Sequence, residues 1–519
     1  MEKQFTYRKS SITARTALGI VRGYESDHIS IFKGIPYAKA ERFHAPGPVD
    51  AWEGELDATS FGYVCPLLEM PKPTGEIFVP HRYWIMDEDC LNLNVWTPAC
   101  DEKKRPVLVW LHGGGFEAGS AIEHIAYEGE NMSRRGDVVV VSINHRLNVL
   151  GYCDLSEFGE EYRNSGNAGT SDMVAALQWV HNNIAAFGGD PDNVTIFGQS
   201  GGGMKVTALL QTPAADGLYH KGIIMSGVQG GAFFDAVGSG RRMGEIMLDH
   251  LGISTVQEME NVPYQDLVSA FKQARYELRP QKINSGETPC RNGFYAGDPL
   301  EVPFRKETAN IPLIIGSTFA EFNGFGMIGI DRKNITDEES AKTIEDKLGK
   351  KLADEAIPLF RQAYPERKII DLLGLDFMFR EYITSYIERR SALNNCTWDY
   401  IFNLDGPMRG GQLPPHCADI PFVFRNTELV PATQQVGVTQ KVEKQIFDTV
   451  MAFVKTGNPN NCSIPQWESD TPKEFHTMVF DENTGVRTNF DRKLIKAMSS
   501  SCLDDMVKNI LTGVAKKPD

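Results

Sequence analysis

One serine of this chain stands in a turn crowded with glycine, where it could act as a nucleophile. Residues 194–212 read VTIFGQSGGGMKVTALLQT, and an alternating apolar run ends just before Ser200. A helical pattern begins directly afterwards. Such a turn holds a hydroxyl out at the end of a strand, and the glycines at 198 and 202 leave room for the chain to bend. A helix N-terminus beneath the hydroxyl favours developing negative charge. A serine that merely caps the helix is the alternative interpretation.

A serine hydroxyl is a weak nucleophile without a base, and the base needs an acid to orient it. For a serine in this kind of turn the acid follows it along the chain and the histidine comes last. His416 lies in GGQLPPHCADIPFVF, residues 410–424, a Gly/Pro-rich loop that follows a strand pattern. We therefore predict that His416 is the base. The other histidines after Ser200 precede a strand pattern or end a helical one: His220, His250 and His476.

The predicted acid is Glu321, which lies just beyond the end of a buried strand pattern. The segment is IPLIIGSTFAEFNGF, residues 311–325. Many other carboxylates lie between Ser200 and His416, so position relative to a strand decides the choice. A surface glutamate is the alternative.

Hydrolysis by a serine also needs donors for a developing oxyanion. The segment HGGGF, residues 112–116, follows another strand pattern and can present backbone N–H groups without hindrance from side chains. Gly114 and Gly115, together with the N–H of Gly201, form the predicted set, and loss of one such donor typically costs roughly 3–4 kcal/mol of transition-state stabilisation. A phosphate-binding loop is the competing interpretation, but HGGGF matches neither GxxxxGK[ST] nor GxGxxG.

The elements that must position these residues alternate between strand and helix. A helical pattern covers residues 171–187, with Ser171 and Asp172 at its expected N-cap. This alternation predicts an α/β protein with a mainly parallel sheet and helices on both faces, which binds ligands beyond the carboxyl ends of the strands. The strand patterns are residues 106–116, 137–147, 194–199, 221–227, 311–317 and 398–404.

Composition places the chain among globular proteins. Its 519 residues are 41% hydrophobic and 23% charged. We expect one domain over residues 1–519, with helical insertions at about 230–310 and 325–395 that cover the active edge of the sheet. The net charge of −15 argues against nucleic acid and anionic membranes as partners. The expected partner is a small-molecule substrate, and the oligomeric state stays open.

The cysteines and the start of the chain bear on its location. The nine cysteines are odd in number and contain no CxxC, which favours neither a disulfide scaffold nor a zinc site. The first residues lack the apolar core of a signal peptide, and no apolar stretch is long enough to span a bilayer. We therefore expect a cytoplasmic location.

These motifs resemble those of the type-B carboxylesterases, the α/β-hydrolases that include the cholinesterases. The resemblance implies an α/β-hydrolase fold, with Ser200 as nucleophile, Glu321 as acid and His416 as base. It also implies the same three oxyanion donors, and no metal or organic cofactor. FGQSGGG and HCADIPFVF are more similar to bacterial cytoplasmic members than to animal ones. The segments that carry the resemblance are GIPYAKAERFHAPGPVDAW, EDCLNLNVWTP, LHGGGF, GNAGTSDMVAALQWVHNNIAAFGGDPDNVTIFGQSGGG, GSTFAEFNGF, HCADIPFVF and FVKTGNPN.

The resemblance also implies roles for residues that support the site. Cys65 and Cys90 match the first disulfide of the family, although a reducing cytoplasm would keep them as thiols. Ser226 matches a buried serine near the catalytic histidine. Two ion pairs of the family correspond to Arg42 with Glu88 and to Arg146 with Asp172.

Two positions near the expected site bear on the substrate. Gln199 stands where the family commonly has glutamate, which removes a negative charge beside the serine and weakens the case for a cationic substrate. Trp84 lies in the loop that carries the choline-binding tryptophan of cholinesterases, but its spacing to Cys90 differs, so we interpret it as a packing residue.

We expect a serine carboxylic-ester hydrolase that forms an acyl-enzyme on small to medium, largely uncharged, apolar or aromatic esters. Activity should fall at acidic pH, because a protonated His416 cannot accept a proton. Carbamates, lactones or hydroxycinnamoyl esters are alternative substrates for the same triad. A non-enzymatic cholinesterase-like binding protein is the alternative from another class, but that branch typically lacks a member of the triad. Four phenylalanines could line an apolar pocket or pack in the core: Phe233, Phe234, Phe319 and Phe322.

Overall fold

The computed structural model describes residues 8–69, 79–228, 230, 238–281, 283–327, 329–408 and 411–501. Contacts divide the chain into two compact units. Unit 1 holds the described residues of Met1–Thr74 and His81–Ile311, and unit 2 holds those of Gly75–Pro80 and Pro312–Lys516. The single domain expected over residues 1–519 stays a prediction.

Unit 1 is built on a mixed sheet whose inner strands are parallel. In the described residues the strand order is β1-β2-β3-β5-β7-β6-β8-β9, and β4 pairs with β2. Strands β7, β6, β8 and β9 are parallel neighbours. The successive pairs β1–β2, β2–β3, β3–β5 and β5–β7 are antiparallel, and β4 pairs with β2 in parallel. The bounds are β1 Arg8–Arg15, β2 Ile20–Ser26, β3 Ile29–Pro36, β4 Glu55–Asp57, β5 Asn92–Thr97, β6 Arg105–Leu111, β7 Val139–Ile143, β8 Gly189–Gln199 and β9 Lys221–Met225.

The buried stretches of the parallel strands are mostly apolar because both of their faces are covered. All five residues of β7 and all five of β9 are buried, and the same holds for the last five of β6. Buried parallel strands are expected to show such continuous runs rather than alternation. The four strand patterns predicted in this part of the sequence are confirmed as β6, β7, β8 and β9.

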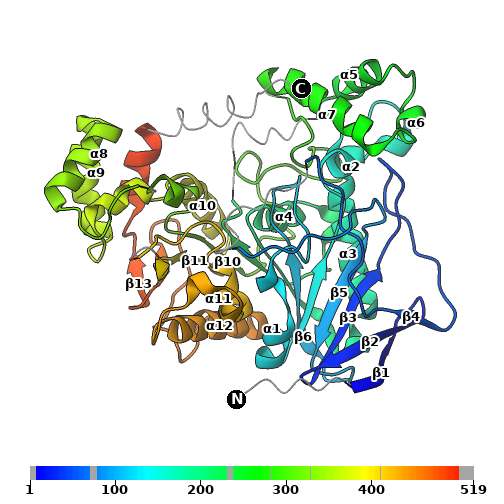
Figure 1. The fold of residues 1–519 in the computed structure, drawn as a ribbon, viewed down its shortest axis with the longest axis horizontal. Coiled ribbons are helices and arrows are strands. Elements are labelled where there is room, and N and C mark those ends of the chain that lie inside the picture. Colours follow the sequence, from blue (N-terminus) through cyan, green and yellow to red (C-terminus); the bar gives the residue numbers. More distant parts are fainter. Residues whose placement is uncertain are drawn as a thin grey trace. The chain divides into compact units, whose positions relative to one another are not determined.

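Helices of unit 1 pack against this sheet, and others gather away from it. Helices α3 and α4 contact β8, and α1 contacts β5 and β7. Helices α5, α6 and α7 lie together at the end of unit 1 opposite to β1 and β4 (Figure 1). The bounds are α1 Glu130–Gly136, α2 Asn148–Tyr152, α3 Ala168–Asn183, α4 Gly201–Leu210, α5 Arg241–Leu251, α6 Val256–Met259 and α7 Tyr264–Leu278.

The predicted N-cap of α3 was wrong. The helix begins at Ala168 with Asn167 at its cap, so Ser171 and Asp172 lie inside the first turns. Ser171 Oγ donates to the Asn167 carbonyl at 3.1 Å, four residues earlier. The Asp172 carboxylate is taken up by an ion pair with Arg146 rather than by the helix N-terminus. Local capping chemistry at these residues was therefore overridden by tertiary contacts.

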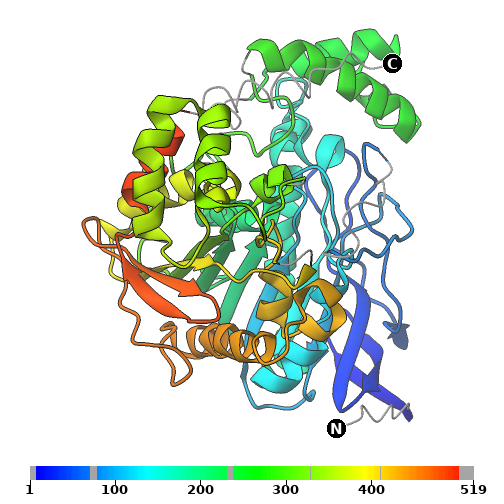
Figure 2. The same ribbon diagram turned by 60° about the vertical axis from the view of Figure 1, so that its left-hand side comes forward.

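Unit 2 continues the α/β pattern with strands in the order β10-β11-β12-β13. The first three are parallel, and β12 and β13 form an antiparallel hairpin, drawn in orange and red in Figure 2. Helices α8 and α9 lie side by side (Figures 1 and 2). The bounds are β10 Leu313–Thr318, β11 Thr397–Phe402, β12 His476–Phe480, β13 Gly485–Thr488, α8 Asp337–Leu348, α9 Lys350–Ala363, α10 Met378–Ser391, α11 Ile420–Phe424 and α12 Thr439–Thr456.

The two remaining strand predictions are confirmed as β10 and β11. Helices α5–α7 fall in the first range predicted as an insertion and α8–α10 in the second, whereas residues 283–310 of the first range form no helix. That these ranges are insertions covering the site stays a prediction. Within the described ranges, no helix combines the length and apolar character that crossing a membrane requires.

Candidate active site

Ser200 occupies the tight turn between β8 and α4. Its backbone angles are φ 58° and ψ −126°, a conformation that L-residues other than glycine rarely adopt. The Ser200 N–H donates to the carbonyl of Met225 at the end of β9, at 2.8 Å. A strained residue of this kind costs on the order of 1–3 kcal/mol and persists only where its surroundings hold it. The geometry therefore fits the strand–nucleophile–helix turn predicted from the sequence.

Glycine is required on both sides of Ser200 because the backbone of β6 passes very close. A Cβ on Gly202 would lie 1.9 Å from the Leu111 carbonyl oxygen, and one on Gly198 would lie 2.4 Å from the carbonyl carbon of Gly202. Real Cβ atoms do not approach backbone so closely. The crowding predicted at these two glycines is therefore confirmed.

The predicted oxyanion donors come from two turns that touch. Gly114 and Gly115 have φ values of 83° and 62°, which favour glycine at both positions. A Cβ on Gly201 would lie only 2.2 Å from the Gly115 nitrogen, so the two backbones are in direct contact. Gly201 is also the first residue of α4, where an N–H has no intrahelical acceptor. Unit 1 thus gathers a serine and glycine amides at the ends of β6 and β8.

Unit 2 brings together the predicted acid and base. His416 Nδ1 donates a hydrogen bond to the Glu321 carboxylate. The two segments also pair through their backbones, because Glu321 bridges Pro415 and the His416 N–H donates to the Glu321 carbonyl at 3.2 Å. The side chain of Glu321 is 1% exposed and that of His416 is 10% exposed. An imidazole held this way through Nδ1 presents Nε2 as a proton acceptor.

The last residue of β10 fixes the predicted acid. The Thr318 N–H donates to Glu321 Oε1 at 2.7 Å, and the Glu321 N–H donates to Thr318 Oγ1 at 3.1 Å. Glu321 has a φ of 32°, so its backbone is strained. The second carboxylate oxygen, Oε2, is the one that accepts from His416.

Two further buried carboxyls lie near this pair, and neither was predicted from the sequence. Asp376 accepts from the backbone N–H groups at the start of α10, and burial together with the Glu321 charge raises its pKa to about 8. Asp419 accepts from the Tyr400 hydroxyl at 2.7 Å, and burial raises its pKa to about 6. Asp419 lies three residues after His416, and this spacing was the signal available in the sequence.

Unit 1 also buries polar residues at the ends of β8 and β9 and in α4. Gln199 and Ser226, at the ends of β8 and β9, are 1% and 0% exposed. Lys205 of α4 is fully buried, and its Nζ donates to the His112 carbonyl at 2.8 Å. Burial lowers the pKa of Lys205 to about 7. Lys205 thereby connects α4 to the glycine loop, and a single lysine inside an apolar helical run was the only sign of it in the sequence.

The two predicted ion pairs are present in unit 1. Arg42 Nη2 lies 2.5 Å from Glu88 Oε1, and Arg146 Nη2 lies 2.7 Å from Asp172 Oδ1. Arg146 and Asp172 are both buried, so each charge depends on the other for compensation.

The cysteines and the tryptophan singled out in the sequence lie in the same unit. Cys65 and Cys90 are buried free thiols, and a hydrogen bond with Cys65 together with burial raises the pKa of Cys90. Trp84 is 39% exposed and packs edge-on against Phe61, with ring centroids 5.6 Å apart. In the described part of the chain, no three His, Cys, Asp or Glu residues are grouped as metal ligands.

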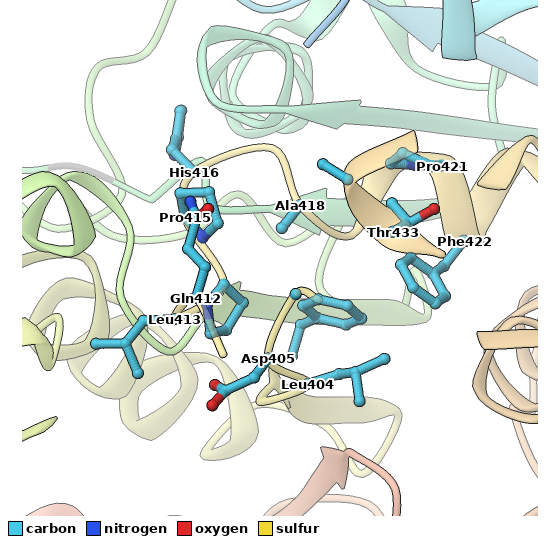
Figure 3. Close-up of a pocket in the computed structure, with 14 residues that line it drawn as sticks. Leu404, Asp405, Gln412, Leu413, Pro415, His416, Ala418, Pro421, Phe422 and Thr433 are labelled. Atoms are coloured by element: carbon cyan, nitrogen blue, oxygen red, sulfur yellow. The ribbon is translucent and has the colours of Figure 1, made fainter. Parts of the chain in front are cut away.

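An apolar pocket lies next to the His416 loop (Figure 3). Leu404 and Asp405 lie on one side of it, and Ala418 and Pro421 on the other. The Asp405 carboxylate is bound by two arginines at 2.6 and 3.0 Å, so its charge is compensated. The full lining is Phe402, Leu404, Asp405, Gly406, Gln412, Leu413, Pro414, Pro415, His416, Ala418, Pro421, Phe422, Ala432 and Thr433.

The four phenylalanines proposed for a pocket have different outcomes. Phe319 is fully buried in the core of unit 2, so for it the core interpretation holds. Phe322 is 49% exposed. Phe233 and Phe234 lie outside the described residues.

Comparisons with known proteins agree over nearly the whole chain. The model of the Carboxylesterase family matches residues 10–497. Para-nitrobenzyl esterase of Bacillus subtilis strain 168 is 33% identical over 491 residues, which cover 91% of this chain and 96% of that protein. Phenmedipham hydrolase of Pseudarthrobacter oxydans is 31% identical over 506 residues, with coverages of 92% and 97%.

A solved structure is similar over the same length. It is an esterase from the anaerobe Clostridium hathewayi that can hydrolyse aliphatic aromatic polyesters. It superposes with a TM-score of 0.92 at 45% identity, covering 96% of this chain and 100% of that one. The α/β-hydrolase fold expected from the resemblance is thereby confirmed.

Proposed function

The chain belongs to the carboxylesterase family of α/β-hydrolases, and on that premise we propose that it hydrolyses carboxylic esters through Ser200, Glu321 and His416. The hydrogen bond between His416 and the buried Glu321 carboxylate is the observation that supports this most strongly. It holds an imidazole in the tautomer that a general base requires. The strained turn at Ser200 supports the same proposal, since such turns are typical of nucleophiles.

The proposed reaction has two halves. Nε2 of His416 accepts the Ser200 proton as Oγ attacks the ester carbonyl, and the N–H groups of Gly114, Gly115 and Gly201 donate to the oxyanion. His416 then gives its proton to the leaving alcohol, and an acyl-enzyme remains. In the second half, His416 removes a proton from water, which attacks the acyl carbonyl and releases the acid. Glu321 stabilises the imidazolium in both halves.

The substrates we propose are uncharged esters with apolar or aromatic groups. The pocket beside the His416 loop is apolar, and its one carboxylate is bound by two arginines. The names of similar proteins point the same way, since one is a para-nitrobenzyl esterase and another hydrolyses aliphatic aromatic polyesters. Gln199 leaves the position beside Ser200 without a formal charge, which agrees with an uncharged substrate.

The proposal is tested by single and double substitutions assayed on para-nitrophenyl butyrate. Ser200→Ala and His416→Gln should each lower kcat by a factor on the order of 10⁴–10⁶. The kcat of the double variant should equal that of the less active single variant, because the two residues act as a unit. Melting temperatures within a few degrees of the wild type would establish that the variants fold. If Ser200→Ala kept more than a tenth of the wild-type kcat, the proposed nucleophile would be wrong.

We also propose a cytoplasmic location, because Cys65 and Cys90 are neighbouring thiols that a reducing compartment would preserve. Alkylation of the denatured protein immediately after lysis, followed by peptide mass spectrometry, should find both cysteines alkylated. A disulfide-linked pair of peptides would argue for an oxidising compartment.

A further inference from the structure

One aromatic ring stands directly against the proposed base. Phe322 follows Glu321 in the chain, and its ring centroid lies 4.4 Å from that of His416, with an angle of 32° between the ring planes. Phe322 is nevertheless 49% exposed, which makes it one of the most exposed large apolar side chains of the described residues. An aromatic ring that packs against the imidazole and is half exposed can receive another apolar group.

The backbone holds Phe322 in this position. Glu321 pairs with Pro415, and the His416 N–H donates to the Glu321 carbonyl at 3.2 Å, so the two chain segments run together. The residue after the acid therefore lies beside the residue after Pro415. The backbone pairing that brings Glu321 and His416 together therefore also sets the position of the Phe322 ring.

A second phenylalanine supports the ring from the interior. Phe379, in the first turn of α10, is 1% exposed and lies 5.6 Å from the His416 ring and 6.0 Å from the Phe322 ring. The N–H of Phe379 donates to Asp376, which fixes this end of the helix. The three rings thus form a cluster in which Phe379 is enclosed and Phe322 is the exposed member.

The chemistry of the base indicates which part of a substrate would meet Phe322. His416 must protonate the leaving oxygen of the ester, so the alcohol group attached to that oxygen lies alongside the imidazole. The acyl group is attached to the carbonyl carbon that Ser200 attacks, and it extends away from that oxygen. A ring packed on the imidazole is therefore placed to contact the alcohol group.

We propose that Phe322 is a specificity-determining residue that forms an aromatic wall for the alcohol part of the ester and favours benzyl and aryl leaving groups. This inference rests on the proposed triad. An aromatic pair contributes more than its buried area alone, so the preference should favour aromatic rings over saturated rings of similar size.

The test uses two pairs of esters that differ only in aromaticity. The first pair varies the alcohol, as benzyl acetate and cyclohexylmethyl acetate. The second varies the acyl group, as methyl benzoate and methyl cyclohexanecarboxylate. Phe322→Leu should lower the ratio of kcat/KM for benzyl to cyclohexylmethyl acetate by about five- to tenfold, while the ratio for the acyl pair changes by less than about twofold. Phe322→Tyr, which keeps the ring, should retain the wild-type alcohol ratio.

The outcomes separate the inference from the function on which it rests. Equal losses on all four esters in Phe322→Leu would mean that the ring only supports His416, and a change confined to the acyl pair would place it on the acyl side. Either result would overturn the inference while leaving ester hydrolysis intact. If Ser200→Ala hydrolysed these esters as fast as the wild type, the proposed function itself would be wrong.

Discussion

At the level of single side chains, the proposed activation of Ser200 depends on how His416 is held. Its imidazole is bound through Nδ1 to a carboxylate that is itself bound by the Thr318 amide. Two such partners fix the orientation of the buried carboxylate. In the proposed mechanism, the role of Glu321 is electrostatic as well as geometric.

Replacing Glu321 by glutamine separates those two contributions. The amide has nearly the same shape but no charge, so it cannot stabilise the imidazolium that forms in the transition state. We expect Glu321→Gln to lower kcat by about 10³–10⁴-fold and to change KM by less than about threefold. Steady-state kinetics on para-nitrophenyl butyrate measure both values. A kcat within tenfold of the wild type would show that the charge of Glu321 does not contribute.

Asp419 gives a prediction for stability against pH. Burial raises its pKa to about 6, so the native carboxyl is still protonated at pH 5, where the unfolded one has mostly ionised. The stabilisation from this group is present at low pH and is lost as the pH rises through about 6. Asp419→Asn removes this titrating group. The unfolding free energy of the wild type should therefore fall by about 1.5 kcal/mol more between pH 5 and pH 8 than that of the variant.

Urea unfolding at pH 5 and pH 8 measures this difference. The control is Asp346→Asn in α8, because Asp346 is exposed. The control should show the wild-type change with pH. If Asp419→Asn showed the same change in unfolding free energy with pH as the wild type, the raised pKa of Asp419 would be wrong.

At the level of secondary structure, the close approach of β6, β8 and α4 explains why a strained serine can persist. The Leu111 carbonyl lies where a side chain on Gly202 would begin. The turn also contacts β9, through the bond from the Ser200 N–H to Met225. Three strands therefore hold one turn, and its strain is offset by contacts elsewhere.

Gly202→Ala tests this packing. The added Cβ would lie 1.9 Å from the Leu111 carbonyl oxygen. The other atoms nearest to it are also backbone atoms, of Leu111 and His112, which cannot shift as a flexible side chain could. We expect a loss of at least about 3 kcal/mol of unfolding free energy, together with a fall in kcat. Gly293→Ala is the matched control, since a Cβ there meets no atom within 4 Å. Similar urea midpoints for the two variants would contradict the close packing inferred at the turn.

For the chain as a whole, the sequence predicted the elements that carry the chemistry better than it predicted their surroundings. The proposed nucleophile, acid and base each follow a strand pattern, and Glu321 and His416 do form a hydrogen-bonded pair. The strands themselves could be recognised because buried parallel strands are continuously apolar. Short apolar runs of this kind depend little on the rest of the fold.

What the sequence could not predict depends on tertiary burial. Asp376, Asp419 and Lys205 look like ordinary polar residues in the sequence, yet all are buried beside the proposed site. The start of α3 was misplaced because Asp172 binds a buried arginine instead of capping the helix. The burial and the ion pairs of these residues depend on partners far away in the sequence, and a local sequence pattern does not reveal such partners.

The central claim is that His416 activates Ser200. The most direct measurement is the rate and site of covalent labelling by diethyl para-nitrophenyl phosphate, followed by intact-mass and peptide mass spectrometry. The account predicts one diethylphosphoryl adduct per chain, on the peptide containing Ser200, and a labelling rate reduced by at least about 10³-fold in His416→Gln. An adduct on another residue, or labelling of His416→Gln at the wild-type rate, would contradict it.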